Sequence, residues 1–413
     1  IETPAIELNK TLSGKYGEEG DRLMFKVLPR GRKLSKLAGK TEEDIRSQIE
    51  EALRYDLTVP LARFVVDNRN ELSFPFKRYQ IQNVWRADRP QKGRYREFTQ
   101  CDADVVGVAG IVQEAEFLHI YDQVFRELGL SVKIEINHRA LLQSLAQACG
   151  AFDRFTDFTV SLDKLDKIGW DGVEKEWNEK GIKVKAMHKE LLEKPLQLNE
   201  DDLQKLEAIL PEGNFAQSAL MDLRGLARLL SSSPLKSATL ELNLSLARGL
   251  DYYTGCIIEV KAEGVDLGSI GGGGRYDELT ALFGLKDMPG MGISFGLDRI
   301  QLAMEMAGLF QEDGGASAEV ILANMGEDDL PYGFEIVQEL RSLGIAVEIY
   351  PAKARFKKQI DFAVRNGMRY MLIAGEDERN SSKIIIKDLN AGEQQVLDRK
   401  DLGKRIQELL EAE

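Results

Sequence analysis

The stretch from Thr239 to Val260 constrains the fold more strongly than any other part of the sequence. Leucines alternate with polar or small residues in 239–247, which predicts a strand with one buried face. The segment Arg248–Gly255 then supplies an arginine, a carboxylate, two tyrosines and a turn signal, and Cys256–Val260 predicts a returning strand. Taken alone, this stretch is explained by an ordinary ion pair on a hairpin. Its significance depends on the motifs elsewhere in the chain.

The composition narrows the class of protein. A chain of 413 residues with 43% hydrophobic and 30% charged residues is expected to be a soluble globular protein with two or three domains. Its three cysteines are far apart and form no CxxC pair, which argues against a disulfide framework and a zinc site. There is no apolar run of membrane-spanning length, and the N-terminal residues do not resemble a signal peptide. We therefore expect a cytoplasmic location.

The charge distribution bears on nucleic-acid binding. A net charge of −13 argues against a general nucleic-acid coater. A selective RNA partner stays open, because binding depends on local basic patches. One such patch is 77–100, with seven Lys or Arg against two acids, and others are 30–40 and 353–358.

Hydrophobic periodicity predicts the main elements of the first part. Strands are expected at Ile1–Leu8, Phe76–Trp85, Arg94–Val106 and Ser131–Asn137, helices at Thr41–Leu53 and Val112–Leu128, a turn and helix at Asp56–Asp67, and a hairpin or loop at Gly14–Arg32. Thr41 and Asp44 have the spacing of a helix cap.

The domain organisation follows from changes in this pattern. Residues 138–237 are helical and charged with few strand signals, which predicts an inserted helical subdomain. Residues 1–137 and 238–313 then form one interrupted domain. Residues 314–413 follow a Gly-Gly linker and alternate strands with helices, which predicts a separate α/β domain.

The first candidate site is the basic segment Arg86–Phe98. It holds four arginines and a lysine in a strand, loop and strand. A solvated basic hairpin is the ordinary explanation for such a charge run. The alternative is a device that presents forked guanidinium donors to phosphate oxygens.

The second candidate is Gly290–Arg299. Its glycine spacing does not match the dinucleotide fingerprint, which makes a Rossmann site unlikely on these residues. The functional interpretation is a strand that leads into a helix and exposes Arg299 to a nucleotide. A close-packed Gly-rich strand explains the segment equally well.

Acidic residues form a third group. Asp102 and Asp104 follow Gln100, and Asp56 and Thr58 lie upstream. Paired acids can indicate a metal site or a general base, and a single unpaired acid in a pocket can hold an amine or an imidazolium. The four glycines of 271–274 permit close approach to a ligand or a tight turn. The three histidines lack ligand spacing, and no Ser/His/Asp arrangement is visible.

Taken together, these motifs resemble a known family. Arg86–Phe98 resembles motif 2 of class II aminoacyl-tRNA synthetases, Gly290–Arg299 resembles motif 3, and Ile1–Glu7 resembles the strand half of motif 1. The segments Arg248–Tyr253 and Gly272–Asp277 resemble two signatures of histidyl-tRNA synthetases, and Leu53–Thr58 matches their amino-acid-binding loop. The resemblance covers essentially the whole chain. It implies an α+β catalytic domain on a mixed, mainly antiparallel sheet, a helical insertion and a C-terminal α/β anticodon-binding domain.

The resemblance also implies a two-step reaction. ATP and L-histidine form histidyl-adenylate, and the histidyl group passes to the 3′-terminal ribose of tRNA(His). Mg²⁺ is the implied cofactor, no protein metal ligand is assigned, and a homodimer is implied. The role of the insertion is expected to be contact with the tRNA acceptor arm.

Site roles carry over position by position. Arg86 and Arg248 are the implied catalytic residues, since both face the α-phosphate and Arg248 also holds the substrate carboxylate. Arg94 and Arg299 join Arg86 in binding ATP. The implied histidine-binding residues are Asp56, Leu57, Thr58, Gln100, Asp104, Arg248, Tyr252, Tyr253 and Tyr276.

Some features depart from the family pattern. The helix half of motif 1 is expected to be missing from this chain, Asp298 stands where Glu is common, and Glu278 replaces a small or amide residue. Two alternatives remain: a synthetase-like regulator that binds histidine or tRNA without aminoacylation, and a class II synthetase for another amino acid. The C-terminal domain opposes the first, and the two signatures oppose the second.

Overall fold

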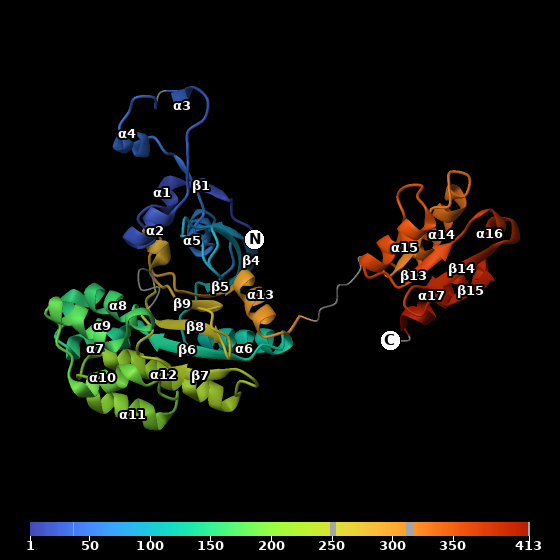
Figure 1. Ribbon diagram of the computed structural model, residues 1–413. Coiled ribbons are helices and arrows are strands. Elements are labelled where there is room, and N and C mark those ends of the chain that lie inside the picture. Colours follow the sequence, from blue (N-terminus) through green and yellow to red (C-terminus); the bar gives the residue numbers. More distant parts are fainter. Residues whose placement is uncertain (36, 248–252, 311–317, 412–413) are drawn as a thin grey trace. The chain divides into compact units, whose positions relative to one another are not determined.

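The structure is a computed structural model that describes residues 1–413 except 36, 248–252, 311–317 and 412–413 (Figure 1). The chain divides into two compact units, Ile1–Leu309 and Phe310–Glu413. Each unit has hydrophobic cores of its own. No helix in the described parts of the chain combines the length and the apolar character needed to cross a membrane.

A large sheet forms the centre of the first unit. Within the described residues it has seven strands in the order β4-β5-β10-β9-β8-β6-β7. The strands are β4 (Phe76–Trp85), β5 (Glu97–Val106), β6 (Val132–His138), β7 (Thr239–Leu242), β8 (Cys256–Ala262), β9 (Gly271–Arg275) and β10 (Gly290–Gly296). Strands β6 and β7 run parallel, and the other neighbouring pairs run antiparallel. The mixed, mainly antiparallel sheet is confirmed.

One face of this sheet is apolar and is covered by helix α6 (Val112–Glu127). The rings of Tyr121 and Phe295 lie 4.7 Å apart, and the Tyr121 hydroxyl donates to the carbonyls of Gly272 and Ser294, each at 2.9 Å. Helix α6 therefore holds the two central strands from behind. The opposite face is left for polar side chains.

Strand β9 rules out one of the two interpretations of 271–274. The four glycines form no tight turn, because they occupy a central strand between β8 and β10. A Cβ at Gly273 would collide with the carbonyl oxygen of Gly292 and lie 2.8 Å from the Cα of Ile293. The adjoining backbones pack too closely for any side chain. A short 3-10 helix, Leu279–Phe283, follows the strand.

The N-terminal part builds a small sheet in the order β1-β3-β2 beside several short helices. Its elements are β1 (Ile6–Leu8), α1 (Asn9–Leu12), α2 (Gly17–Leu23), β2 (Lys26–Val27), α3 (Arg32–Ser35), α4 (Glu42–Ser47), β3 (Glu51–Leu53) and α5 (Thr58–Asp67). The Thr41 hydroxyl accepts from the Asp44 N–H at 3.2 Å, so the predicted cap is confirmed.

Two predictions for this part are wrong. Helix α2 occupies the segment expected to form a hairpin, and the helix expected to reach Leu53 ends at Ser47. Residues 51–53 instead pair with β1 and β2. Pairing with distant strands overrides the local helical pattern there.

The helical insertion between β6 and β7 is confirmed. It contains α7 (Arg139–Ala148), η1 (Phe152–Arg154), α8 (Phe155–Leu162), α9 (Leu165–Glu179), α10 (Ala186–Glu193), α11 (Glu200–Ile209) and α12 (Asn214–Ser232). Its return to the sheet is held by the Asp122 carboxylate, which accepts from the N–H groups of residues 236, 237 and 238 at 2.7–2.9 Å. Burial opposes ionisation of Asp122, but these donors lower its pKa to about 2.

Strand β7 is shorter than predicted. It ends at Leu242, and the chain turns at Asn243, whose side chain accepts from the N–H and the hydroxyl of Ser245. The amide of Asn137 donates to the carbonyls of Leu244 and Leu246. These side-chain bonds replace the ladder bonds of the predicted strand.

The second unit is an α/β domain, as predicted. In its described residues, a five-stranded sheet has the order β12-β11-β13-β14-β15. Its elements are β11 (Val320–Leu322), α14 (Leu330–Ser342), β12 (Val347–Ile349), α15 (Phe356–Arg365), β13 (Tyr370–Ile373), α16 (Glu376–Ser381), β14 (Lys383–Asp388), β15 (Gln394–Asp398), η3 (Arg399–Asp401) and α17 (Leu402–Glu411). Helix α16 was not predicted.

The close approach of β9 and β10 leads to a stability prediction. We expect Gly273→Ala to lower the free energy of unfolding by about 1–3 kcal/mol, because the added methyl group would collide with backbone atoms. Gly213→Ala is the control: Gly213 has extended backbone, and no atom lies within 4 Å of the position that an added methyl would take. Urea unfolding of both variants measures the difference, and equal stabilities would contradict the packing argument.

Candidate active site

Strand register places the predicted site residues on the polar face of the large sheet. Gln100, Asp102 and Asp104 alternate along β5 and pair with Gly296, Ser294 and Gly292 of β10. Directly paired residues point to the same face. On the other side of β5, Asp104 pairs with Arg78. This face, which we call the polar floor, therefore carries acids, amides and glycines.

Asp104 lies at the centre of a buried polar cluster. The Tyr276 hydroxyl donates to its Oδ1 at 2.5 Å, and an Arg78 guanidinium nitrogen lies 2.8 Å from its Oδ2. Burial raises the pKa of Asp104, although the Arg78 charge and the Tyr276 hydrogen bond oppose the shift. The structure thus brings together Asp104 and Tyr276, two residues predicted to frame an imidazole.

Arg275 fixes the position of Tyr276. Its Nε and one terminal nitrogen donate to the carboxylate of Glu114 at 2.7 and 2.8 Å, and the same nitrogen donates to the Gly110 carbonyl at 2.7 Å. Arg275 and Glu114 are both buried. A buried bidentate ion pair of this kind costs about 3–5 kcal/mol when one partner is removed, so it holds the neighbouring tyrosine firmly.

Asp56 begins a second side of the site. Its Oδ1 accepts from the Tyr16 hydroxyl at 2.9 Å and from the Val59 N–H at 3.1 Å. Burial raises the pKa of Asp56, and the two hydrogen bonds and the charges of Arg86 and Arg78 oppose the rise. The next residue, Leu57, is buried, and its carbonyl accepts from Arg78 at 3.2 Å. Thr58 opens helix α5.

Gln100, Ser294 and Asp102 form a chain of polar contacts across β5 and β10. The Gln100 amide donates to the Ser294 hydroxyl at 2.9 Å. Ser294 is paired with Asp102 across the two strands, and its hydroxyl acts to lower the pKa of Asp102. The Gln100 Oε1 and the Asp102 Oδ1 are buried and find no hydrogen-bond partner among the described residues. This arrangement leaves acceptors for a ligand.

The glycines of the floor make room for the tyrosines. A Cβ at Gly274 would lie 2.8 Å from the ring of Tyr253. Cβ atoms at Gly290 and Gly292 would collide with the Tyr276 ring and the Asp104 carboxylate. Side chains at these glycines would fill the space that the aromatic walls and the acid occupy.

Arg86 stands where β4 enters the basic loop. Its Nε donates to the Tyr55 carbonyl at 3.1 Å, and its guanidinium lies 4.4 Å from the Tyr55 ring centroid and 5.1 Å from that of Phe98. Stacking between two rings fixes the plane of the guanidinium. Arg86 and Asp56 are close enough for the arginine charge to affect the carboxylate.

Arg299 and Arg94 meet at the basic loop. Arg299 belongs to α13 (Leu297–Met306) and donates to the Gly93 carbonyl at 2.6 Å and the Ser269 carbonyl at 2.8 Å. Arg94 is exposed, and its Nε lies 3.7 Å from an Asp88 oxygen. Arg299 therefore holds the loop that presents Arg94, an anchoring contact that the sequence did not predict.

The segment Arg248–Gly255 is only partly described by the structure. Arg248 and Tyr252 lie in residues 248–252, outside the described residues, so the expected packing of Arg248 beside Arg86 stays a prediction. Tyr253 is described, and its carbonyl accepts from Arg139 at 3.0 Å.

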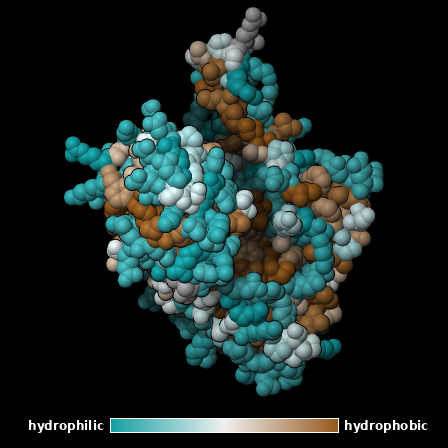
Figure 2. Space-filling model, turned by 90° about the vertical axis from the view of Figure 1, so that its right-hand side faces the viewer, coloured by the Kyte–Doolittle hydropathy of each residue, from teal (hydrophilic) through white to brown (hydrophobic). Residues whose placement is uncertain are grey.

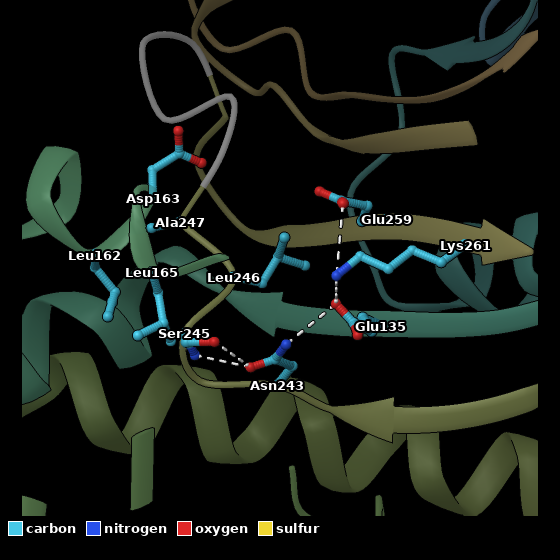
Figure 3. A pocket seen from close by; sticks show the side chains of 10 residues that line it. All are labelled: Glu135, Leu162, Asp163, Leu165, Asn243, Ser245, Leu246, Ala247, Glu259 and Lys261. Atoms are coloured by element: carbon cyan, nitrogen blue, oxygen red, sulfur yellow. Dashed lines mark hydrogen bonds and ion pairs between the residues drawn. The ribbon is translucent and has the colours of Figure 1, made fainter. Parts of the chain in front are cut away.

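A polar pocket continues the floor over β6, β8 and the turn that follows β7 (Figure 3). The Glu135 carboxylate forms an ion pair with the Lys261 ammonium at 3.0 Å and accepts a hydrogen bond from the Asn243 amide at 3.1 Å. Burial opposes ionisation, but these contacts lower the pKa of Glu135 below its ordinary value. Glu135 in this pocket is thus paired with a cation and an amide donor, whereas the Asp102 Oδ1 has no hydrogen-bond partner in the described residues.

Sequence reasoning missed three contributors to the site. Arg78 could have been found, because strand alternation in β4 places it on the same face as Gln80 and Gln82. Tyr16 contacts Asp56 from 40 residues away, and Ser294 contacts Gln100 from 194 residues away. No local sequence pattern predicts contacts between residues so far apart in the chain. Among the described residues, no three His, Cys, Asp or Glu side chains gather into a metal-binding group.

Family comparisons agree with this geometry. The family model for histidyl-tRNA synthetase matches residues 1–300, and the model for the anticodon binding domain matches residues 319–409. The histidine--tRNA ligase of Christiangramia forsetii is 50% identical over 409 residues, which cover 96% of this chain and 89% of that protein. That of Flavobacterium johnsoniae is 45% identical over 444 residues and covers 98% of this chain and 91% of the relative.

Solved structures give the same result. The histidyl-tRNA synthetase from Nostoc sp. PCC 7120 has a TM-score of 0.78 and 31% identity, covering 99% of this chain and 90% of that chain. An ATP phosphoribosyltransferase regulatory subunit/histidyl-tRNA synthetase from Bacillus halodurans C has a TM-score of 0.67 at 21% identity, which shows a shared fold. Given the two family matches and the near full-length identities, this chain belongs to the histidyl-tRNA synthetase family.

Proposed function

We propose that this chain activates L-histidine with ATP and transfers the histidyl group to the 3′-terminal ribose of tRNA(His). Family membership supports the reaction class. The observation that carries the substrate assignment is the buried Asp104–Tyr276 pair on the polar floor, which offers a fixed carboxylate and hydroxyl to an imidazole. A site built to hydrogen-bond a ring rejects isosteres without ring nitrogens, because its own polar groups would be left unpaired.

The remaining side chains divide between the two ends of the amino acid. Asp56, Thr58 and Gln100 hold the α-amino group, and Leu57 positions that loop through its bond with Arg78. Tyr252 and Tyr253 join Asp104 and Tyr276 around the imidazole. These roles combine the family resemblance with the shared face of β5 and its neighbours.

Catalysis of the first step rests on fixed positive charge. Attack of the histidine carboxylate on the α-phosphorus brings two anions together, so positioned cations lower the barrier. Arg86 is held between two aromatic rings and faces the α-phosphate. By resemblance to the family, Arg248 is the second cation at the α-phosphate and also binds the histidine carboxylate. Removing one such donor typically costs about 3–4 kcal/mol of transition-state stabilisation.

The basic loop and α13 bind the β- and γ-phosphates and the adenine of ATP. Arg94 is exposed on that loop, and Arg299 fixes the loop at Gly93. Mg²⁺ would neutralise the departing pyrophosphate. It needs few protein ligands there, because Mg²⁺ at phosphates is bound by phosphate oxygens, water and one or two carboxylates.

Recognition of tRNA falls to the second unit and the insertion. The second unit matches the anticodon-binding family and carries Lys353, Lys357 and Lys358 near the start of α15. The helical insertion contacts the acceptor arm. A regulator that binds histidine or tRNA without aminoacylation is less well supported, because Arg86 and Arg299 are both present beside a complete anticodon-type domain.

A homodimer in the cytoplasm is the proposed working form. Strand β4 lies at one edge of the large sheet and exposes 73% of Tyr79 and 55% of Ile81. Figure 2 shows further hydrophobic surface at the top of the view, where the N-terminal sheet and α3–α4 lie in Figure 1. Exposed apolar side chains of that part include Ile6, Leu8, Leu28 and Leu34. Exposed apolar groups of this kind typically mark interfaces.

The function predicts a specific exchange reaction. The purified protein should catalyse ATP–pyrophosphate exchange with L-histidine and with no other amino acid of a full panel, since the polar pocket rejects isosteres. Exchange with none of the twenty, or with a different one, would overturn the proposal.

The arginine assignments predict a second result. We expect Arg86→Ala and Arg248→Ala each to reduce the exchange rate at saturating histidine by about 10²–10³-fold, on the scale of lost transition-state donors. Thermal stability should change much less in both variants. Histidine binding should change much less in Arg86→Ala, whereas loss of the carboxylate contact in Arg248→Ala should weaken it. Arg46→Ala is the control, because Arg46 lies exposed on α4 and pairs only with the exposed Glu42 among the ion pairs of the described residues. Near-normal exchange in either test variant would refute its catalytic role.

Removing the second unit should separate the two half-reactions. A chain ending at Leu309 keeps the cores of the first unit, so adenylate formation should survive while tRNA charging falls far more. Exchange and aminoacylation assays on the same preparation measure both. Equal losses would count against the second unit as the tRNA reader.

A further inference from the structure

Asp102 has no assigned role, yet it occupies the middle of the polar floor. It lies between Gln100 and Asp104 on β5 and pairs with Gln80 on one side and Ser294 on the other. Its side chain is 4% exposed. It therefore belongs to the same buried row as the residues proposed to bind histidine.

The contacts of Asp102 are incomplete. The Gln100 amide donates to the Ser294 hydroxyl, and Ser294 is paired with Asp102 across β5 and β10. The Asp102 Oδ1 lacks any hydrogen-bond partner in the described part of the chain, as does the Oε1 of Gln100. A buried acceptor without a donor is costly, which indicates a ligand that supplies one.

The charges around Asp102 are also unbalanced. Asp104 faces it, with Arg78 and Tyr276 as direct partners, and Asp56 acts on it from the loop before α5. Behind the sheet, α6 places the Tyr121 hydroxyl at the Ser294 carbonyl, and burial raises the pKa of that hydroxyl, so that it stays neutral. Among these described groups, three carboxylates therefore face one buried cation, Arg78, and Asp56 also lies within reach of the Arg86 charge. Burial and the Asp104 charge raise the pKa of Asp102 to about 7, against the opposing effects of Arg78 and Ser294.

We propose that Asp102 is a specificity-determining residue that binds the α-ammonium group of the substrate together with Asp56 and Gln100. This proposal rests on the proposed function and extends it to a residue that the family motifs do not assign. A primary ammonium supplies three N–H donors and one positive charge. Those donors match the open oxygens of Asp102 and Gln100, and the charge offsets the excess of carboxylates.

The test compares ligands that differ at the amino group. Asp102→Asn keeps the shape of the side chain and removes its charge. We expect it to weaken calorimetric binding of L-histidinol, which has the amine and the imidazole, by about ten- to a hundredfold. Binding of imidazole-4-propionate, which lacks the amine, should change by less than about threefold on the same scale. Glu116→Gln is the control, because this exposed α6 residue also loses one carboxylate.

The pH dependence supplies a readout that a merely structural role would not move. The wild-type advantage over Asp102→Asn for L-histidinol should be full above about pH 7 and should shrink as the pH falls below it, because protonated Asp102 is neutral. The imidazole of the ligand titrates equally for both proteins and cancels in the ratio. If Asp102→Asn does not fold, Ser294→Ala keeps the carboxylate and should weaken L-histidinol binding selectively, by a smaller factor.

The outcomes separate the two proposals. Equal losses for both ligands, no loss for L-histidinol, or a ratio independent of pH would each overturn the role of Asp102. Selective and pH-dependent loss without ATP–pyrophosphate exchange in the wild type would support Asp102 and remove the catalytic function. A wild-type protein that binds neither ligand would overturn both.

Discussion

The site depends on the close approach of two glycine-rich strands, β9 and β10. Gly273 meets the backbone of β10 so tightly that even a methyl group would displace it. Because β9 and β10 project so little from the polar face, the rings of Tyr253 and Tyr276 and the carboxylate of Asp104 can occupy the space above them. Helix α6 supports these strands from the opposite side through Tyr121. The floor is thus rigid and open at the same time.

The second constraint on this floor is electrostatic. Burial makes unpaired charge expensive, and the structure resolves most of that cost with internal partners: Arg78 and Tyr276 for Asp104, Glu114 for Arg275, and Lys261 for Glu135. Among the acids of this floor, Asp102 has an oxygen, Oδ1, with neither a hydrogen bond nor an ion pair in the described residues. The paired acids are held in place, and an open acceptor is one to which a ligand can donate a hydrogen bond.

The two sets of arginines work differently. Arg86 is stacked between rings and retains donors for a phosphate, whereas Arg299 uses donors to hold the loop at Gly93. Motif matching alone treats both as phosphate ligands. The contacts indicate that Arg299 also shapes the loop that carries Arg94, so its removal would disturb the loop as well as the charge.

Sequence alone determined the family-level architecture, since strand alternation, the basic loop and the glycine spacing are local patterns. It also proposed Asp56, Gln100, Asp104 and Tyr276 as site residues, because motif order is visible in one dimension. Tertiary structure alone decided that the four glycines form a central strand, that residues 51–53 leave a helical pattern to join a sheet, and that Tyr16, Arg78 and Ser294 complete the site. The physical reason is the same in each case. Such features arise from contacts between residues far apart in the chain, whose energies of burial and pairing no local pattern contains.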